Sequence, residues 1–380
     1  MHLKTRIAGT LTAALALLLI GAAPAQAGKT SRALDSALDE VMAQPGSPPG
    51  LSVLMQRGGG VEFLRRGVAN LESGAPMRSR QHYRIASVAK AYSGAVALAL
   101  ASKGKLKLTD TIGDWIPKLL PKAKDVTIAQ ALQHTAGLAD YIRQDEFIDI
   151  LMEDPERYIS PKEILSFVER KDTRFKPGSR YEYSDTDNIV VGLIAEKATG
   201  KQYENLLRKY VYRPADMHRT SLPRTVKMPN PYIHGYDLPE DEPPFDTSEV
   251  INPAGAWASG GIVSTPRDMN KFVRAYVGGD LFSRKVGRAQ NDFVVGSSQP
   301  PGPGRNQATL GLFRYESRCG TMYGHTGSFP GYRAMAMSNA SGRRSIVFTV
   351  NSQIVPGQGS QEVSDLIRHA QEDAVCHLLR

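Results

Sequence analysis

Cysteine and closely spaced histidine are scarce in this chain of 380 residues. Only two cysteines occur, Cys319 and Cys376, and their spacing does not match a zinc motif. The eight histidines include no close pair at a spacing suited to binding one metal ion. We therefore expect no metal, and nothing in the sequence implies another cofactor.

Long basic runs and nucleic-acid-binding motifs are also missing. The net charge is +9 at pH 7, but the positive residues are not clustered along the chain. A mild surplus of this kind suits a cell wall rich in anionic polymers, and it equally suits an ordinary solvated surface. We therefore expect no nucleic-acid partner.

The N-terminal residues have the pattern of a signal peptide. Lys4 and Arg6 precede an apolar core at residues 7–19, and an Ala-x-Ala cleavage site follows at residues 25–27. A membrane anchor is the alternative, but the apolar run is short and small residues follow it. No cysteine lies near the cleavage site, and no long apolar run lies near the C-terminus. We predict that residues 1–27 are removed and that the protein is secreted, either outside the cell or into a periplasm, without a membrane anchor and as a monomer.

Export would make a disulfide between Cys319 and Cys376 possible, because exported proteins meet an oxidising environment. An even pair of cysteines in an exported chain is more often bridged than free.

The remaining chain, residues 28–380, is longer than one hydrophobic core usually supports, so we expect two intertwined lobes. Residues 51–56 and 61–69 flank a glycine-rich turn and predict a β-hairpin. Further strands and one final helix are expected near the C-terminus, at residues 310–315, 321–325, 332–337, 345–350 and 360–380. We predict an α/β (α+β) fold in which both chain ends build an antiparallel sheet flanked by helices. Residues 105–260, approximately, would form an α-rich lobe.

The segment at residues 83–101 carries the first sign of chemistry. It predicts a short extended approach followed by an Ala-rich helix that begins at Ser87. Residues three apart lie on the same helix face, so Lys90 would lie beside the Ser87 hydroxyl. A serine becomes nucleophilic when a neighbour takes its proton, and a partly buried lysine can do this. Taken alone, Ser-x-x-Lys is a weak signal, because a capping serine and a solvated lysine give the same pattern.

Two later motifs strengthen the signal. Tyr183 begins a Tyr-Ser-Asp segment, and His325 begins a His-Thr-Gly segment. The three motifs, in this order and at these separations, resemble those of the serine β-lactamase and penicillin-binding superfamily. The resemblance covers nearly the whole mature chain, and it is nearest to the secreted D-alanyl-D-alanine carboxypeptidases of actinobacteria. In those enzymes a cysteine before the third motif is bridged to one in the C-terminal helix, which implies a Cys319–Cys376 disulfide.

The resemblance implies roles for individual residues. Ser87 would be the nucleophile, Lys90 or Tyr183 would be the general base, and Tyr183 would pass a proton to the leaving group. The backbone N–H groups of Ser87 and Ser328 would hold the oxyanion. The remaining substrate-binding residues would lie on the third motif: His325, Thr326 and Gly327. His134 would instead be a buried residue that fixes its loop.

Two departures from the family pattern weaken the carboxypeptidase interpretation. Asp185 stands where the second motif usually has asparagine, and an ionised carboxylate can accept hydrogen bonds but cannot donate them. Asp185 could pair with Lys90 or favour a substrate with a free amine. The family's carboxylate-binding arginine would be Arg314, unless Phe313 occupies that place, since a shift of one residue turns a side chain to the other face of a strand.

We expect a serine D-alanyl-D-alanine carboxypeptidase that acts on peptidoglycan-type peptides and is inhibited by β-lactam antibiotics. An esterase, a β-lactamase or a D-aminopeptidase acting on another small acyl substrate remains an alternative on the same scaffold. A penicillin-binding or wall-binding module without turnover is a third hypothesis, against which the intact Ser87, Lys90 and Tyr183 argue.

Overall fold

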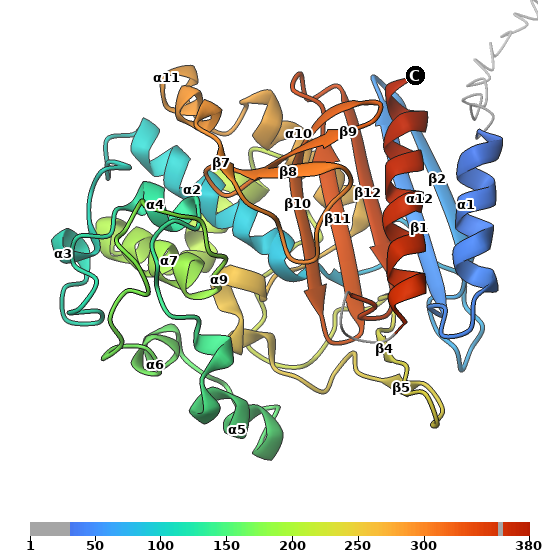
Figure 1. The fold of residues 1–380 in the computed structure, drawn as a ribbon, viewed down its shortest axis with the longest axis horizontal. Coiled ribbons are helices and arrows are strands. Elements are labelled where there is room, and N and C mark those ends of the chain that lie inside the picture. The colour runs from blue at the N-terminus through green and yellow to red at the C-terminus, as the bar shows by residue number, and fades with distance from the viewer. Residues whose placement is uncertain (1–30, 356–359) are drawn as a thin grey trace, which may run out of the picture.

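The computed structural model describes residues 31–355 and 360–380, so the predicted signal peptide lies outside the described residues. Figure 1 shows a sheet packed between helices on one side of the molecule and a mainly helical region on the other. The predicted fold class is therefore confirmed. Within the described ranges, no helix is both long and apolar enough to cross a membrane.

The described residues form one large antiparallel sheet of eight strands, in which the two ends of the chain meet. The strand order is β2-β1-β12-β11-β10-β9-β8-β7. The first hairpin pairs with β12, so that Leu51 lies opposite Val350. The strands span β1 Gly50–Arg57, β2 Gly60–Gly67, β7 Val294–Val295, β8 Arg305–Ala308, β9 Phe313–Ser317, β10 Gly320–Phe329, β11 Tyr332–Ser338 and β12 Arg344–Val350.

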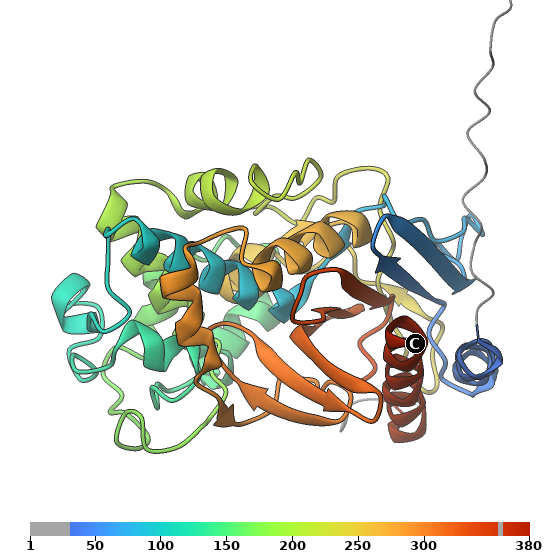
Figure 2. The same cartoon turned by 90° about the horizontal axis from the view of Figure 1, so that it is seen from above.

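Helices cover both faces of this sheet. One face carries α1, Arg32–Ala43, and α12, Gln361–Leu379, which lie side by side. The other face carries α10, Pro266–Gly278, and α2, Ala89–Ser102 (Figure 2). Two short strands, β3 Tyr83–Arg84 and β6 Val263–Ser264, pair beside the entrance to α2. The turn at the start of α2 also contacts β10 and β11 of the large sheet.

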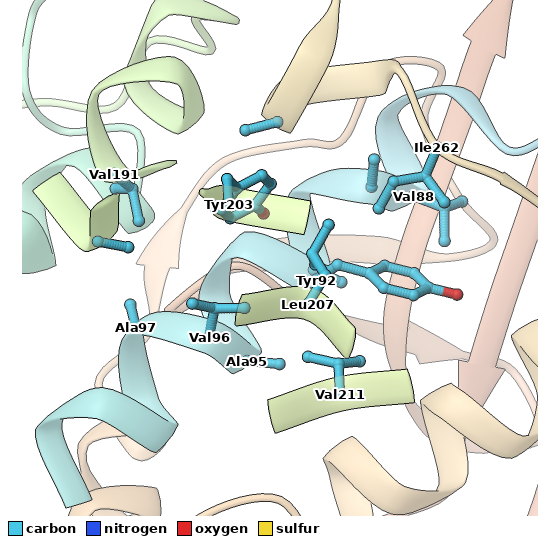
Figure 3. Packing of buried hydrophobic residues seen from close by; sticks show 14 of the residues in the cluster. Val88, Tyr92, Ala95, Val96, Ala97, Val191, Tyr203, Leu207, Val211 and Ile262 are labelled. Carbon is cyan, nitrogen blue, oxygen red and sulfur yellow. The ribbon is translucent and has the colours of Figure 1, made fainter. Parts of the chain in front are cut away.

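The middle of the chain supplies the helical region. Its helices are α3 Ile112–Trp115, α4 Ile128–Leu132, α5 Asp145–Glu153, α6 Pro161–Ser166, α7 Thr186–Thr199, α8 Tyr203–Leu207, α9 Trp257–Gly260 and α11 Arg284–Gly287. A short ribbon of β4 Tyr236–Asp237 and β5 Phe245–Asp246 lies instead next to the end of β12, where Tyr236 bridges Ser352. Helix α2 runs into this region and packs against α7 and α9. Figure 3 shows the packing around Tyr92 and Val96 of α2, which meet Leu207 and Val211. Since α2 is buried along its length, the residues at its start are held rigidly.

The expected hairpin, C-terminal strands and final helix all occur. Helix α2 is entered through a 3₁₀ turn at Ala86–Val88 rather than beginning directly at Ser87. Helix α7 ends at Gly200, whose φ of +66° suits glycine.

Candidate active site

Ser87 lies in the tight turn between β3 and α2. The preceding residue, Ala86, has a φ of +52°, a conformation that costs energy for any residue with a side chain. Gly327 of β10 packs directly against this turn, and a β-carbon there would lie 2.7 Å from the Ser87 nitrogen. Ser328, the next residue, lines the same cavity as Ser87. The fold thus brings the first and third motifs into contact, and a serine of each motif region lines the same cavity.

Lys90 lies one turn along from Ser87 and is fully buried. Its Nζ is 3.1 Å from Ser87 Oγ, 2.6 Å from Asp185 Oδ1 and 3.0 Å from the Ser259 carbonyl oxygen. These three acceptors match the three N–H donors of a protonated lysine. In this arrangement Lys90 is an ammonium ion held between the serine hydroxyl and a carboxylate.

Tyr183 faces this group from the segment before α7. Lys90 Nζ lies 5.0 Å from the centre of its ring, and the residue is 6% exposed. The hydroxyl forms no hydrogen bond with another described residue. Burial and the charge of Asp185 raise the pKa of Tyr183 well above its usual value, although the nearby Ser87 hydroxyl acts in the opposite direction. Tyr183 therefore keeps its proton in the resting state.

Asp185 is anchored by a residue that the sequence did not single out. Its backbone N–H donates to Asp140 Oδ1 at 3.1 Å, and Asp140 is 6% exposed. Burial first, and the Asp185 charge second, raise the pKa of Asp140 to about 7. Asp140 follows the His134 loop by a few residues, but no motif marked it as part of the site. A carboxylate buried by tertiary packing has no local sequence signature.

His134 lies behind the site, as expected from the resemblance. Its ring is 4.4 Å from the Tyr183 ring, and its Nδ1 is 2.8 Å from Asp187 Oδ2. Burial lowers the pKa of His134 and raises that of Asp187, so both are driven toward their neutral forms. The His134 carbonyl also accepts the Glu182 N–H. These contacts fix the segment that carries Tyr183.

The other residues of the third motif are placed differently from the prediction. His325 and Thr326 are each 1% exposed, and neither lines the cavity at Ser87. The Thr326 hydroxyl donates to the Pro300 carbonyl, and His325 Nδ1 contacts the Thr326 carbonyl. Burial and the charge of Lys90 lower the pKa of His325 to about 3, so its ring is neutral. The predicted position of these two side chains at the substrate cleft is therefore not supported by the lining of the cavity at Ser87.

The prediction that Arg314 binds a substrate carboxylate also needs correction. Arg314 does not line the cavity; its guanidinium bonds Gln307 and Glu316 and lies over the Phe293 ring. The neighbouring Phe313 is the residue that turns toward the site, with its ring 5.1 Å from His325. The strand register thus places an aromatic ring where an arginine was expected, because adjacent residues of a strand point to opposite faces.

The cavity beside Ser87 has a volume of about 240 Å³. Among its described lining residues, Asp185 is the only one with a charged side chain, and no lysine, arginine or histidine is present. The large apolar side chains that line it are Ile142, Phe147, Leu151, Ile251, Phe329 and Pro330. The cavity therefore suits an apolar group more than an anion.

Cys319 and Cys376 form a disulfide that joins the turn between β9 and β10 to α12. Neither cysteine lines the cavity at Ser87. Within the described part of the chain, no group of three or more His, Cys, Asp or Glu side chains is arranged to hold a metal ion.

The family described as Beta-lactamase matches residues 34–370, so the chain belongs to this family of serine β-lactamases and penicillin-binding proteins. Two relatives come from Bacillus subtilis. The putative penicillin-binding protein PbpX is 24% identical over 306 residues, covering 77% of this chain and 70% of its own length. Penicillin-binding protein 4* is 24% identical over 338 residues, covering 80% of this chain and 68% of its own length.

Solved structures share the fold. A D-stereospecific amidohydrolase from Streptomyces superimposes with a TM-score of 0.75 at 24% identity, covering 88% of this chain and 97% of that one. D-amino acid amidase from Ochrobactrum anthropi, complexed with D-phenylalanine, gives a TM-score of 0.77 at 24% identity. The match covers 90% of this chain and 97% of the amidase chain. The chain is thus a member of a serine hydrolase superfamily with the fold of these amidases.

Proposed function

We propose that this protein is a serine hydrolase that forms an acyl-enzyme at Ser87 from amides or esters with an apolar acyl group. The observation that carries the proposal is the cavity itself: Ser87 opens into an apolar space without a cationic side chain among its described lining residues. A substrate with a terminal carboxylate would find no positive partner there. An apolar neutral substrate needs no such partner, and a substrate with an amine would find the Asp185 carboxylate. The similar fold of two proteins, one named as a D-stereospecific amidohydrolase and one as a D-amino acid amidase complexed with D-phenylalanine, supports the same substrate class.

The contacts support a proton route for acylation. Ser87 Oγ attacks the carbonyl carbon while its proton moves to Lys90 Nζ, which passes one of its own protons to Asp185 at 2.6 Å. The raised pKa of Tyr183 keeps the phenol protonated, so Tyr183 donates to the leaving nitrogen or oxygen. The proton on Asp185 then returns through Lys90 to Tyr183. The groups are reset, and water releases the acyl group by the reverse route.

In this proposal the backbone N–H groups of Ser87 and Ser328, two residues that line the cavity, stabilise the negative charge that develops on the substrate oxygen. Each donor of this kind contributes roughly 10²-fold or more to the rate.

A D-alanyl-D-alanine carboxypeptidase inhibited by penicillins is the second candidate. The Cys319–Cys376 disulfide, which the resemblance to those enzymes implied, favours it, as does the similarity to proteins named as penicillin-binding proteins. The position of Arg314 argues against it. We also propose that the protein acts after export, as the N-terminal sequence predicts.

The test compares substrates on the purified mature protein. It uses nitrophenyl esters of increasing acyl length, amides of apolar D-amino acids, a peptide ending in D-Ala-D-Ala and a fluorescent penicillin. We expect turnover of the apolar amides or esters, loss of turnover in Ser87→Ala, and little D-alanine release. D-alanine release faster than amide and ester turnover would overturn the proposal in favour of the carboxypeptidase.

Two variants of α5 test the acyl pocket. Leu151 lines the cavity, whereas Met152, its neighbour, is 79% exposed and does not. We expect Leu151→Ala to shift the preference toward longer acyl chains and Met152→Ala to leave it unchanged. An equal effect of the two variants would mean that this cavity does not hold the acyl group.

A further inference from the structure

A second carboxylate, Asp140, lies directly behind the Lys90–Asp185 pair and has no part in the proton route above. It does not line the cavity, so it cannot contact a substrate bound there. Its Oδ1 accepts the backbone N–H of Asp185, the residue that precedes the first turn of α7. The side chain is therefore fixed against the residue that holds Lys90.

The charges around Asp140 do not balance. The titratable and charged groups that act on it come from α2, from the start of α7 and the segment before it, and from its own turn: Lys90, Asp185, Asp187, Tyr183, Tyr141 and Arg143. Lys90 is the one buried cation among them. Arg143 Nε is 3.9 Å from Asp140 Oδ2, but this side chain is 61% exposed and its charge is screened by water.

Carboxylates that share one cation cannot all ionise without a cost, so a proton stays on the cluster near neutral pH. Asp187 contacts His134 and is not one of the three acceptors of Lys90. Asp140 is therefore the member whose ionisation changes the charge next to the Lys90–Asp185 pair.

We propose that Asp140 is a positioning residue that carries the shared proton of this cluster and thereby sets how readily Lys90 releases a proton. When Asp140 is neutral, Lys90 and Asp185 form a balanced pair and the proton can move between them. When Asp140 ionises, a second negative charge holds the ammonium proton on Lys90 and slows the attack by Ser87. The proposal rests on the proposed function, because it acts through the acylation of Ser87.

The kinetic test follows labelling of Ser87 by a fluorophosphonate probe as a function of pH. For the parent protein we expect the maximum labelling rate to fall several-fold as pH rises through about 7, with no change in the probe concentration giving half-maximal rate. Asp140→Asn keeps the acceptor for the Asp185 N–H and removes the titration, so the fall should disappear. Asp149→Asn is the matched control, because Asp149 is an exposed aspartate of α5.

A merely structural role would slow labelling equally at every pH in Asp140→Asn, and that outcome would overturn the inference. So would a pH profile that superimposes on that of the parent. Circular dichroism and thermal unfolding establish that each variant is folded.

A second measurement does not depend on activity. Nuclear magnetic resonance of protein carrying ¹³C-labelled aspartate should show one carboxyl that titrates near pH 7 and is absent in Asp140→Asn. In Asp185→Asn the same carboxyl should titrate about one pH unit lower, because a neighbouring negative charge has gone. The inference is overturned if no such carboxyl exists. If the carboxyl titrates as expected but Ser87 never reacts, the proposed function fails instead, and with it the kinetic part of the inference.

Discussion

Lys90 Nζ lies 2.6 Å from Asp185 Oδ1, and Asp185 lines the cavity beside Ser87. Lys90 is fully buried, while the Asp185 side chain is 14% exposed. A buried ammonium without a partner would be strongly destabilising, so the carboxylate compensates the charge. The family's usual asparagine could accept from Lys90 as well, but it could not take a proton from it. Asp185 is therefore the feature that separates this site from the common pattern.

Replacing Asp185 tests this role directly. Asp185→Asn keeps an oxygen for Lys90 but removes the proton acceptor, so we expect the acylation rate of Ser87 to fall about 10²-fold. The Lys90 hydrogen bond survives, so the protein should still fold, but with a lower unfolding free energy because the charge of Lys90 is no longer compensated. Stopped-flow measurement with an activated ester gives the rate. An unchanged rate would show that the proton of Lys90 does not travel through Asp185.

Gly327 gives a prediction about the approach of β10 to the nucleophile. A β-carbon at this position would lie 2.7 Å from the Ile85 oxygen and from the Ser87 nitrogen, both of which are backbone atoms. The strand or the turn must shift, so Gly327→Ala should cost about 1–3 kcal/mol of unfolding free energy. Acylation should fall more than about 10²-fold, because the oxyanion donors move.

The control for this variant lies in the first hairpin. Gly59 has no atom within 4 Å of an added β-carbon, and its φ is not in the left-handed region. Gly59→Ala should leave both activity and stability within experimental error. Equal behaviour of the two variants would mean that the contact between β10 and the turn is not required.

The unfolding free energy of the protein should depend on pH through Asp140. Its pKa rises from 3.8 in the unfolded chain to about 7 in the folded protein. A raised carboxyl pKa stabilises the folded state at pH values below about 4, and this contribution is lost as pH rises to about 7. Relative to Asp140→Asn, the parent should lose up to about 4 kcal/mol across this window. Urea unfolding at several pH values measures the difference, and parallel curves for the two proteins would contradict the prediction.

The disulfide should raise the unfolding free energy of the protein without affecting the reactivity of Ser87. It closes a loop with a sequence separation of 57 residues, which predicts about 4 kcal/mol from the restricted unfolded chain. Mass spectrometry of the unreduced mature protein should detect no free thiol. Cys319→Ser with Cys376→Ser should lower the unfolding free energy while leaving Ser87 labelling intact. A loss of labelling in the folded variant would place the disulfide in the active site.

The sequence was informative wherever a motif is local or a pattern is periodic. The helix after Ser87 follows from its composition, and the C-terminal strands were expected close to where β9 to β12 occur. Arg314 shows the limit of this reasoning, because two neighbouring strand residues exchange faces when the register moves by one. Only the pairing of Phe313 with Gly324 decides which residue turns toward His325.

The cavity and Asp140 could not be predicted for a different reason. The apolar lining comes from α5, from the segment before α9 and from the end of β10, which are distant in sequence and carry no shared signature. Asp140 matters because packing buries it beside Asp185, and burial is a property of the folded chain. Short motifs identify the reacting groups, whereas the surrounding shell that sets specificity and protonation requires the structure.

The buried pair of His134 and Asp187 supplies the last prediction. His134 has a φ of +57°, which asparagine tolerates, so His134→Asn removes the ring without added backbone strain. Asp187→Asn removes the partner carboxyl group. We expect a double-mutant cycle in urea unfolding to show a coupling of about 1–3 kcal/mol, since the two side chains form one buried contact. Ser87 labelling should also slow in His134→Asn, because Tyr183 loses the ring that packs against it.

The matched control is the pair of His218 and Asp216, whose atoms are 2.7 Å apart while their side chains are 77% and 72% exposed. Water screens such a pair, so its coupling should be below about 1 kcal/mol. The same asparagine substitutions apply there, because Asp216 also has a positive φ, of +54°. Equal couplings for the two pairs would show that burial does not strengthen the His134–Asp187 contact. In that case the position of Tyr183 must depend on the Glu182 hydrogen bond to the His134 carbonyl instead, because that bond survives every substitution in the cycle.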